Sequence, residues 1–295
     1  MSGFDWLFFT EVSLAGLGAG ALLALTGLAF VLIYKATKVV NLAIGEMLMI
    51  GAYVFFSFTA GLGLPWWAAL IAALAAGGLL GAVVERAIIR PMLGESAISV
   101  FMVTIGLGSV LIGLVELTWG AAPTSLPDFM GKAPVFIGPA YVSRKIVIGF
   151  AVAAAVIAVF LIAFRYWRGG VALRATATDQ GAAYSCGINV PAIFSMAWVF
   201  AGVAAAGAGV LVGAVGGISP NMGVFGLSAL VVVIVGGLDS IAGALIGGIL
   251  VGLIEAWAGT YLGGEYKLLT TFGLLLIVLM IRPYGLFGTV EIERL

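Results

Sequence analysis

Glu46 is the residue of this sequence whose type and position best suit chemistry inside an apolar environment. It lies in an apolar stretch five residues after Asn41, where we expect a discontinuity in a helix. A carboxylate is costly in such surroundings and is a functional candidate by default, and free backbone groups at a helix break could line the path of a polar solute. The alternative is a structural glutamate that accepts hydrogen bonds from backbone amides near a helix start. Asn41 and Glu46 are therefore the candidate residues of a solute path.

The residue inventory argues against most enzyme chemistry. The 295 residues contain no histidine and one cysteine, Cys186. Zinc sites, iron–sulfur ligation, intrachain disulfides and Cys–His or Ser–His catalysis are excluded, so we predict no catalytic residues and no metal site. The pair Gly131-Lys132 lacks the other residues of a phosphate-binding P-loop. If the chain pumps, the energy must come from a partner or from an ion gradient.

One polar segment, Arg165 to Pro191, separates two apolar stretches. Its alanine content favours a short helix over Ala172–Cys186, which Gly187 and the following Pro191 would end. A short surface helix between two membrane spans has the shape needed to dock into a groove on a motor subunit. The alternative interpretation is a solvated loop.

The amino-acid composition indicates that the helices carrying these residues lie in a lipid bilayer. The chain is 63% apolar and 9% charged, whereas soluble domains are about 45–50% apolar and about 25% charged. In a bilayer, a helix of about 20 residues crosses the hydrocarbon core with its backbone fully hydrogen-bonded. The net charge of zero argues against a nucleic-acid partner.

We therefore predict an all-α integral membrane protein, a polytopic bundle of about eight to ten transmembrane helices in one domain over residues 1–295. Two of the apolar segments are suspect as simple spans, because Val224–Val235 is short and Val39–Thr59 contains Asn41 and Glu46. The nine candidate segments are Leu14–Tyr34, Val39–Thr59, Trp66–Val84, Ile98–Leu117, Ile146–Phe164, Ala192–Val215, Val224–Val235, Ile241–Ala258 and Leu268–Ile281.

The basic residues predict the orientation, because lysine and arginine near span ends tend to stay in the cytoplasm. With the N-terminus outside and nine spans, nine basic residues fall inside and four outside. The inner ones are Lys35, Lys38, Arg86, Arg90, Arg165, Arg168, Arg174, Arg282 and Arg294, and the outer ones are Lys132, Arg144, Lys145 and Lys267. The loop Thr118–Lys145 would then be the main structure on the outer side.

Small residues recur at a spacing of four inside the apolar segments, as in Gly77/Gly81, Gly209/Gly213 and Gly248/Gly252. This spacing puts them on one helix face and predicts close helix–helix packing. Asn and Gly also stand close together at two span boundaries, Asn41–Gly45 and Asn221–Gly223, but this similarity alone does not establish an internal duplication.

Four motifs follow one another along the chain, namely NLAIGEMLMIGAYV, GVALRATATDQGAAYSCGINV, AGVAAAGAGVLVGAVGGISPNMG and GGLDSIAGALIGGILVGLIE. Together they resemble the LivH-type permeases of bacterial branched-chain amino-acid ABC importers. The resemblance runs from about Gly16 to Phe287. Permeases of this kind also serve urea, short amides and some aromatic acids, so these solutes remain alternatives to amino acids.

The resemblance implies a multi-pass permease of the bacterial inner membrane, surrounded by lipid, that translocates a small polar solute. The implied partners are a LivM-like second permease, two cytoplasmic ATPase subunits that carry ATP and Mg, and a periplasmic solute-binding protein. The chain itself would hold no cofactor and would not be an enzyme. By the same analogy, the residues of the coupling helix on an ATPase are Arg174, Asp179, Ala182, Ala183 and Gly187.

The sequence departs from the family habit at Thr176, Thr178 and Tyr184-Ser185-Cys186, which leaves the single contacts of the coupling helix open. A secondary transporter or channel is the rival interpretation. It would need paired ionisable groups at mid-membrane, and the sequence offers little beyond Glu46. A membrane-embedded enzyme is disfavoured by the missing histidine and the single cysteine.

Overall fold

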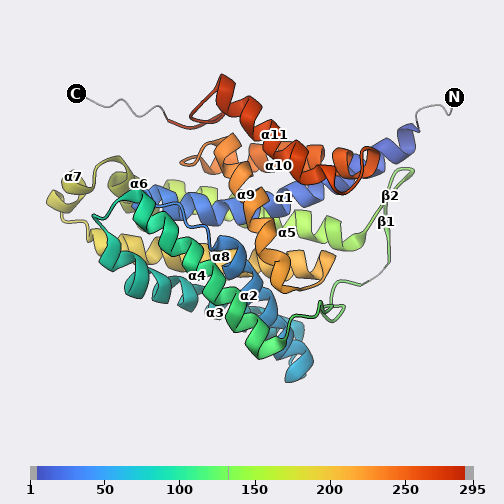
Figure 1. The fold of residues 1–295 in the computed structure, drawn as a ribbon, viewed down its shortest axis with the longest axis horizontal. Coiled ribbons are helices and arrows are strands. Elements are labelled where there is room, and N and C mark those ends of the chain that lie inside the picture. Colours follow the sequence, from blue (N-terminus) through green and yellow to red (C-terminus); the bar gives the residue numbers. More distant parts are fainter. Residues whose placement is uncertain (1–4, 132, 290–295) are drawn as a thin grey trace.

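The computed structural model describes residues 5–131 and 133–289, and it is a bundle of helices with one small hairpin (Figure 1). The helices are α1 (Trp6–Thr37), α2 (Ile44–Phe56), α3 (Trp66–Val84), α4 (Ala97–Trp119), α5 (Arg144–Tyr166), α6 (Arg168–Thr178), α7 (Gln180–Ser185), α8 (Val190–Gly216), α9 (Gly223–Gly236), α10 (Ile241–Tyr261) and α11 (Tyr266–Ile281). Short π or 3-10 turns are η1 (Ser57–Gly61), η2 (Glu85–Ile89), η3 (Arg90–Met92) and η4 (Pro220–Met222), and the strands are β1 (Val135–Ile137) and β2 (Ala140–Val142).

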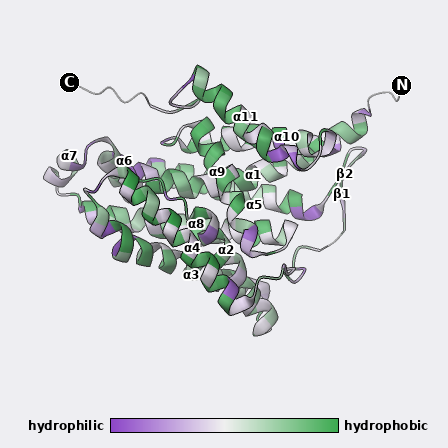
Figure 2. Ribbon diagram, viewed as in Figure 1, coloured by the Kyte–Doolittle hydropathy of each residue, from purple (hydrophilic) through white to green (hydrophobic). Residues whose placement is uncertain are grey.

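Eight of the nine predicted apolar segments are helical throughout in the structure, and the ninth, Val39–Thr59, becomes helical only from Ile44. Within the described residues, seven helices are long and apolar enough to cross a membrane, and the segments Pro220–Gly236 and Tyr266–Ile281 are apolar but shorter. Apolar residues cover most of these helices (Figure 2). The two suspect segments are indeed irregular, because α2 begins only at Ile44 and α9 has 14 residues. The prediction of an all-α membrane bundle is confirmed.

Glycines bring the helices into backbone contact. A Cβ added at Gly20 of α1 would lie 2.5 Å from the carbonyl oxygen of Gly248 in α10, and one added at Gly77 of α3 would lie 2.5 Å from the carbonyl oxygen of Gly202 in α8. Gly209 of α8 approaches the carbonyl of Leu48 in α2 still more closely. Helices in lipid associate through such close packing rather than through a hydrophobic driving force. The packing role predicted for the four-residue spacing is confirmed.

The bundle has two distinct ends. At the hairpin end, the backbone N–H of Tyr141 in β2 donates to Glu11 in α1 at 2.8 Å, and Thr124 pairs with Ile218 as an isolated β-bridge. At the opposite end, which we call the coupling end, α6 and α7 lie against the bundle, and the segment that follows α11 folds back onto α9 (Figure 1). Leu286 and Phe287 donate their backbone N–H groups to the carbonyls of Val235 and Gly236 there.

The hairpin was not anticipated from the sequence. Its three-residue strands are antiparallel, with Val135 opposite Val142, and they turn at Gly138, whose φ of 62° suits glycine. The strands are too short to give an alternating pattern, and the prolines around them favoured a loop interpretation.

The basic residues separate between the two ends as predicted. Eight lie in segments that meet at the coupling end, namely Lys35, Lys38, Arg86, Arg90, Arg165, Arg168, Arg174 and Arg282, and three lie in helix starts at the hairpin end, namely Arg144, Lys145 and Lys267. Lys132 and Arg294 lie outside the described residues.

Candidate functional site: a helix junction and a coupling element

Two short helices begin next to each other inside the bundle, and we call this place the junction. It comprises residues 41–46 at the start of α2 and residues 223–226 at the start of α9. A Cβ added at Gly226 would lie 2.6 Å from the Cα of Gly45, and Gly45 in turn approaches the carbonyl of Gly223. The backbones touch because glycine occupies both sides. The start of α2, and the start of α9 with the 3-10 turn η4 that precedes it, each carry the positive end of a helix dipole, and the N–H of Gly223 is hydrogen-bonded to the carbonyl of Asn221.

Glu46 places its carboxylate between α9 and α4. A Cβ added at Gly223 would lie 2.5 Å from Oε1 of Glu46, and a Cβ added at Gly108 of α4 would lie 3.2 Å from its Cδ. Oε2 is buried and has no hydrogen-bond partner within the described residues. The carboxylate therefore faces two helix N-termini, which stabilise a negative charge, and retains one oxygen able to accept a hydrogen bond.

Asn41 is buried, with 1% of its surface exposed, and it shapes the entry to α2. Its Oδ1 accepts a hydrogen bond from the N–H of Ala43 at 3.0 Å, and its Nδ2 donates to the sulfur of Met47 at 3.5 Å. The chain reaches Asn41 through Lys38, a left-handed residue with a φ of 56° that ends α1. Asn41 thus positions the helix start on which Glu46 stands.

Helix α4 fixes the depth of the junction. The buried hydroxyl of Thr104 accepts a hydrogen bond from the N–H of Leu42 at 3.3 Å, and Gly108 lies one turn further along, against Glu46. These residues are 7 and 11 positions after Ala97, which corresponds to about 10 and 16 Å along the helix axis. If the hydrocarbon core, which is about 30 Å thick, begins near Ala97, the junction lies about a third to half of the way across it.

The sequence reasoning did not identify Thr104 or Gly108, and it noted Gly223 only for the similarity between Asn221–Gly223 and Asn41–Gly45. Thr104 and Gly108 stand at a spacing of four on α4, which is the signal that could have identified a small polar face. The contact between Gly223 and Glu46 joins positions far apart in the chain and has no local signature.

The coupling segment differs from the prediction of one helix over Ala172–Cys186. It forms two helices, α6 and α7, because Asp179 adopts an extended conformation and its Oδ1 accepts from the N–H of Ala182 at 2.9 Å, which caps α7. At the other end, the φ of 83° at Gly187 stops α7, as expected for glycine after a helix.

The predicted coupling residues have different surroundings. Ala183 is buried in a cluster with Leu173, Val190 and Phe194, so it anchors α7 to the bundle. Arg174 is half-buried and donates to the carbonyl of Arg165 at 3.3 Å. The outward surface carries Asp179, Ala182 and Gly187, together with Tyr184 and the free thiol of Cys186.

An ion pair between a buried carboxylate and a half-buried arginine ties α8, which follows the coupling element, to the end of α3. Arg90 donates through Nε and Nη2 to the two oxygens of Glu85 at 2.9 and 3.0 Å. Ser195 in α8 donates to Glu85 at 2.9 Å, and Arg90 also reaches the carbonyl of Pro191 at 3.3 Å. The side chain of Glu85 is 2% exposed and that of Arg90 is 33% exposed.

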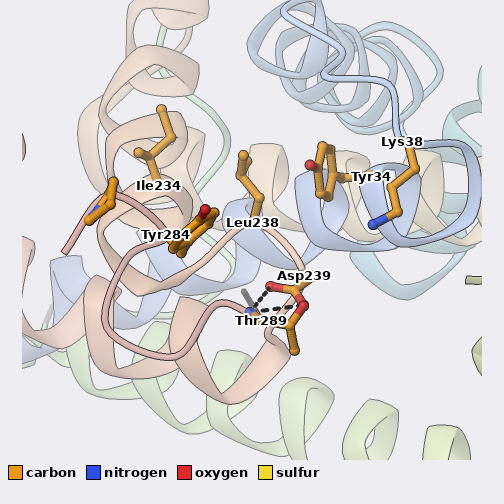
Figure 3. Close-up of a pocket in the computed structure, with 8 residues that line it drawn as sticks. Tyr34, Lys38, Ile234, Leu238, Asp239, Tyr284 and Thr289 are labelled. Atoms are coloured by element: carbon orange, nitrogen blue, oxygen red, sulfur yellow. Dashed lines mark hydrogen bonds between the residues drawn. The ribbon is translucent and has the colours of Figure 1, made fainter. Parts of the chain in front are cut away.

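Asp239 lies in the turn between α9 and α10, and its neighbour Ser240 caps α10 by accepting from the N–H of Gly243. It borders a pocket of about 190 Å³ whose other lining residues include Tyr34, Lys38 and Tyr284 (Figure 3). The carboxylate accepts hydrogen bonds from the backbone and hydroxyl of Thr289, and the Asp239 carbonyl accepts from Nζ of Lys35 at 2.9 Å. This group joins α1, the α9–α10 turn and residues 284–289.

Curated relatives match nearly the whole chain. The high-affinity branched-chain amino acid transport system permease protein LivH of Salmonella typhimurium is 32% identical over 98% of this chain and 99% of its own length. The corresponding protein BraD of Pseudomonas aeruginosa is 31% identical over 95% of both chains. Among solved structures, a chain of PsaBC from Streptococcus pneumoniae in complex with Fab shares the fold, with a TM-score of 0.53 and 16% identity over 95% of this chain and 94% of that one.

The family described as branched-chain amino acid transport system / permease component matches residues 12–279. That range includes the junction, the coupling element, six of the seven helices of membrane-spanning length in full and most of the seventh, α1. With these helices and its LivH relatives, the protein is a multi-pass permease of the inner membrane. The chain belongs to the permease-component family of branched-chain amino acid transport systems.

Proposed function

We propose that this chain lines part of the path of an amino acid in an ATP-driven importer, and that the solute passes the junction. The observation that carries the proposal is the meeting of two helix N-termini with the Glu46 carboxylate near the middle of the membrane. Broken helices at this depth are the usual places where transporters bind polar solutes. The names of the curated relatives support a branched-chain amino acid as the solute.

The charges at the junction suit an amino acid. The free Oε2 of Glu46 can accept a hydrogen bond from the solute's ammonium group. The N–H groups at the starts of α2 and α9 can donate to its carboxylate, since a helix N-terminus favours an anion. Urea or a short amide carries neither charge and would gain less from this arrangement.

The proposed partner on the open side of the path is a LivM-like second permease that covers α4. This helix turns Thr104 and Gly108 toward the junction, while Ser109 on its other side is exposed and added Cβ atoms at Gly106 and Gly113 would meet nothing within 4 Å. A face of small residues allows another helix to approach closely. The solute path would then run between the two permeases.

The proposed energy source is a pair of cytoplasmic ATPase subunits, which would bind ATP and Mg, while this chain has no ATPase site of its own. The exposed outer surface of α6 and α7, from Thr178 to Gly187, would contact them. The excess of basic residues supports a cytoplasmic location for the coupling end. A periplasmic solute-binding protein would deliver the solute at the hairpin end.

The test is Glu46→Gln in the assembled complex, reconstituted in liposomes with the ATPases and the binding protein. We expect intact assembly and a loss of about 10- to 100-fold in solute-coupled ATPase activity and uptake, the scale of one hydrogen bond to a charged group. The matched control is Glu95→Gln, the same substitution on an exposed glutamate in the turn before α4. Wild-type coupled turnover by a well-folded Glu46→Gln complex would remove Glu46 from the path.

A second measurement tests the assembly itself. A tagged chain expressed with its neighbours should co-purify with a second permease and two nucleotide-binding subunits. Purification of an active transporter made of this chain alone, driven by an ion gradient, would favour a secondary transporter.

A further inference from the structure

An apolar groove runs along the outside of the bundle between α3, α5 and α8, away from the junction. Its volume is about 470 Å³, within the range of about 300–1,000 Å³ of ligand pockets. Leu70 and Leu74 of α3 form one wall, Val152 and Val156 of α5 form the other, and Gly207 of α8 lies between them.

The groove exists because its two walls pack on different neighbours. Helix α3 is drawn against α8 by the contacts of Gly77 and Gly81 with Gly202 and Trp198. Helix α5 instead packs on α1, where Gly18 and Leu22 meet Ile146 and Gly149. The middle of α8 is left uncovered, and an added Cβ at Gly207 would meet only the tip of Leu74, at 3.4 Å.

The mouth of the groove at the hairpin end has the chemistry of a membrane interface. Trp66 and Phe129 stack with their ring centroids 6.2 Å apart, and Phe129 also contacts Phe55. Arg144, the first residue of α5, is exposed beside Gly131 and is the one charged side chain among the described residues that line the groove. It has no ion pair or hydrogen bond from its side chain within residues 5–131 and 133–289.

We propose that this groove binds an anionic phospholipid, with one acyl chain between α3 and α5 and the phosphate paired with Arg144. A planar guanidinium pairs well with phosphate oxygens, and aromatic rings at the mouth match the headgroup level of a bilayer. Phe160 stands 16 positions after Arg144 on α5, so the lining of α5 extends about 24 Å along the helix axis. That length accommodates a headgroup and a chain that fills one leaflet, since half the hydrocarbon core is about 15 Å.

An apolar interior combined with a single unpaired cation at the interface favours a lipid as the molecule that occupies the groove. A protein segment would have to bring a carboxylate to Arg144 and an apolar helix into the groove. Phosphatidylglycerol supplies both features in one molecule, and a zwitterionic lipid such as phosphatidylcholine lacks the net negative charge.

Native mass spectrometry of the purified permease complex, titrated with phosphatidylglycerol and with phosphatidylcholine, tests this site. Arg144→Gln should weaken phosphatidylglycerol binding about tenfold, the scale of a charge-assisted hydrogen bond, and abolish the preference for it. Lys145→Gln is the matched control, because the adjacent lysine does not line the groove.

A second pair of variants tests the acyl-chain part. Gly207→Leu would fill the groove and should displace the lipid, whereas Gly216→Leu, the same substitution in an open position of the same helix, should not. Equal lipid retention by Arg144→Gln and the wild type would overturn the headgroup assignment. Retention by a folded Gly207→Leu complex, or crosslinking of the second permease to a cysteine at position 207, would overturn the groove as a lipid site.

Discussion

Arg90→Leu should destabilise the permease strongly, because it leaves a buried carboxylate without its cation. Glu85 is 2% exposed and accepts two hydrogen bonds from Arg90 and one from Ser195. Removing one partner of a buried pair costs about 3–5 kcal/mol, whereas replacing both with apolar residues of similar volume is often neutral. We therefore expect Arg90→Leu to cost about 3–5 kcal/mol, and the double variant Glu85→Leu/Arg90→Leu to restore most of that loss.

Thermal unfolding of the detergent-purified complex, followed by tryptophan fluorescence, measures the difference. Trp198 is buried three residues after Ser195 on α8, so its fluorescence reports on this region. At about 2–4 °C per kcal/mol, Arg90→Leu should lower the melting temperature on the order of 10 °C. A loss below 2 °C for Arg90→Leu, or a double variant as unstable as the single one, would refute the reasoning that an unpaired buried charge is the cause.

Three further predictions concern packing, topology and accessibility. Gly77→Ala places a methyl group 2.5 Å from a backbone oxygen and should lower stability by about 1–3 kcal/mol in thermal melts, whereas Gly106→Ala, which meets nothing within 4 Å, should not. Tags within Thr118–Lys145 should be accessible from the periplasm and tags after residue 289 from the cytoplasm, and accessibility from one side alone would contradict the orientation. A membrane-permeant maleimide should label the exposed Cys186, whereas an impermeant reagent outside intact cells should not. Assembly with the ATPases should slow the labelling, and an unchanged labelling rate would show that Cys186 lies outside the surface that docks on the ATPases.

The helices were predictable because lipid imposes a long apolar run on every span, and Trp66–Val84 was anticipated with the bounds that α3 has. The irregular starts of α2 and α9 were also visible, since Asn41 interrupts one segment and the other is short. The break at Asp179 was missed because the alanines around it favour one continuous helix, while a single capping hydrogen bond decides the local conformation.

Only part of the junction could be predicted from the sequence. Glu46 stood out as a carboxylate in an apolar stretch and Asn221–Gly223 as a segment similar to Asn41–Gly45, but the sequence did not indicate that Gly223 and Gly108 contact Glu46. Their contacts depend on how α4 and α9 pack, and in lipid this packing depends on the complementary shapes of the helix surfaces. A pattern of small residues predicts that close packing occurs without specifying which helices meet.

The backbone hydrogen bonds from Leu286 and Phe287 to the end of α9 have a consequence for biosynthesis. Helix α9 is too short to be held by the bilayer alone, and its last carbonyls find these donors about 50 residues later in the chain. At a synthesis rate of about 5–20 residues per second, α9 waits about 2.5–10 s between its own synthesis and the arrival of the segment that secures it. Maturation of the permease should therefore be late, and in ribosome-bound chains stalled before residue 286 a cysteine introduced at the end of α9 should react with a maleimide faster than it does in the complete chain.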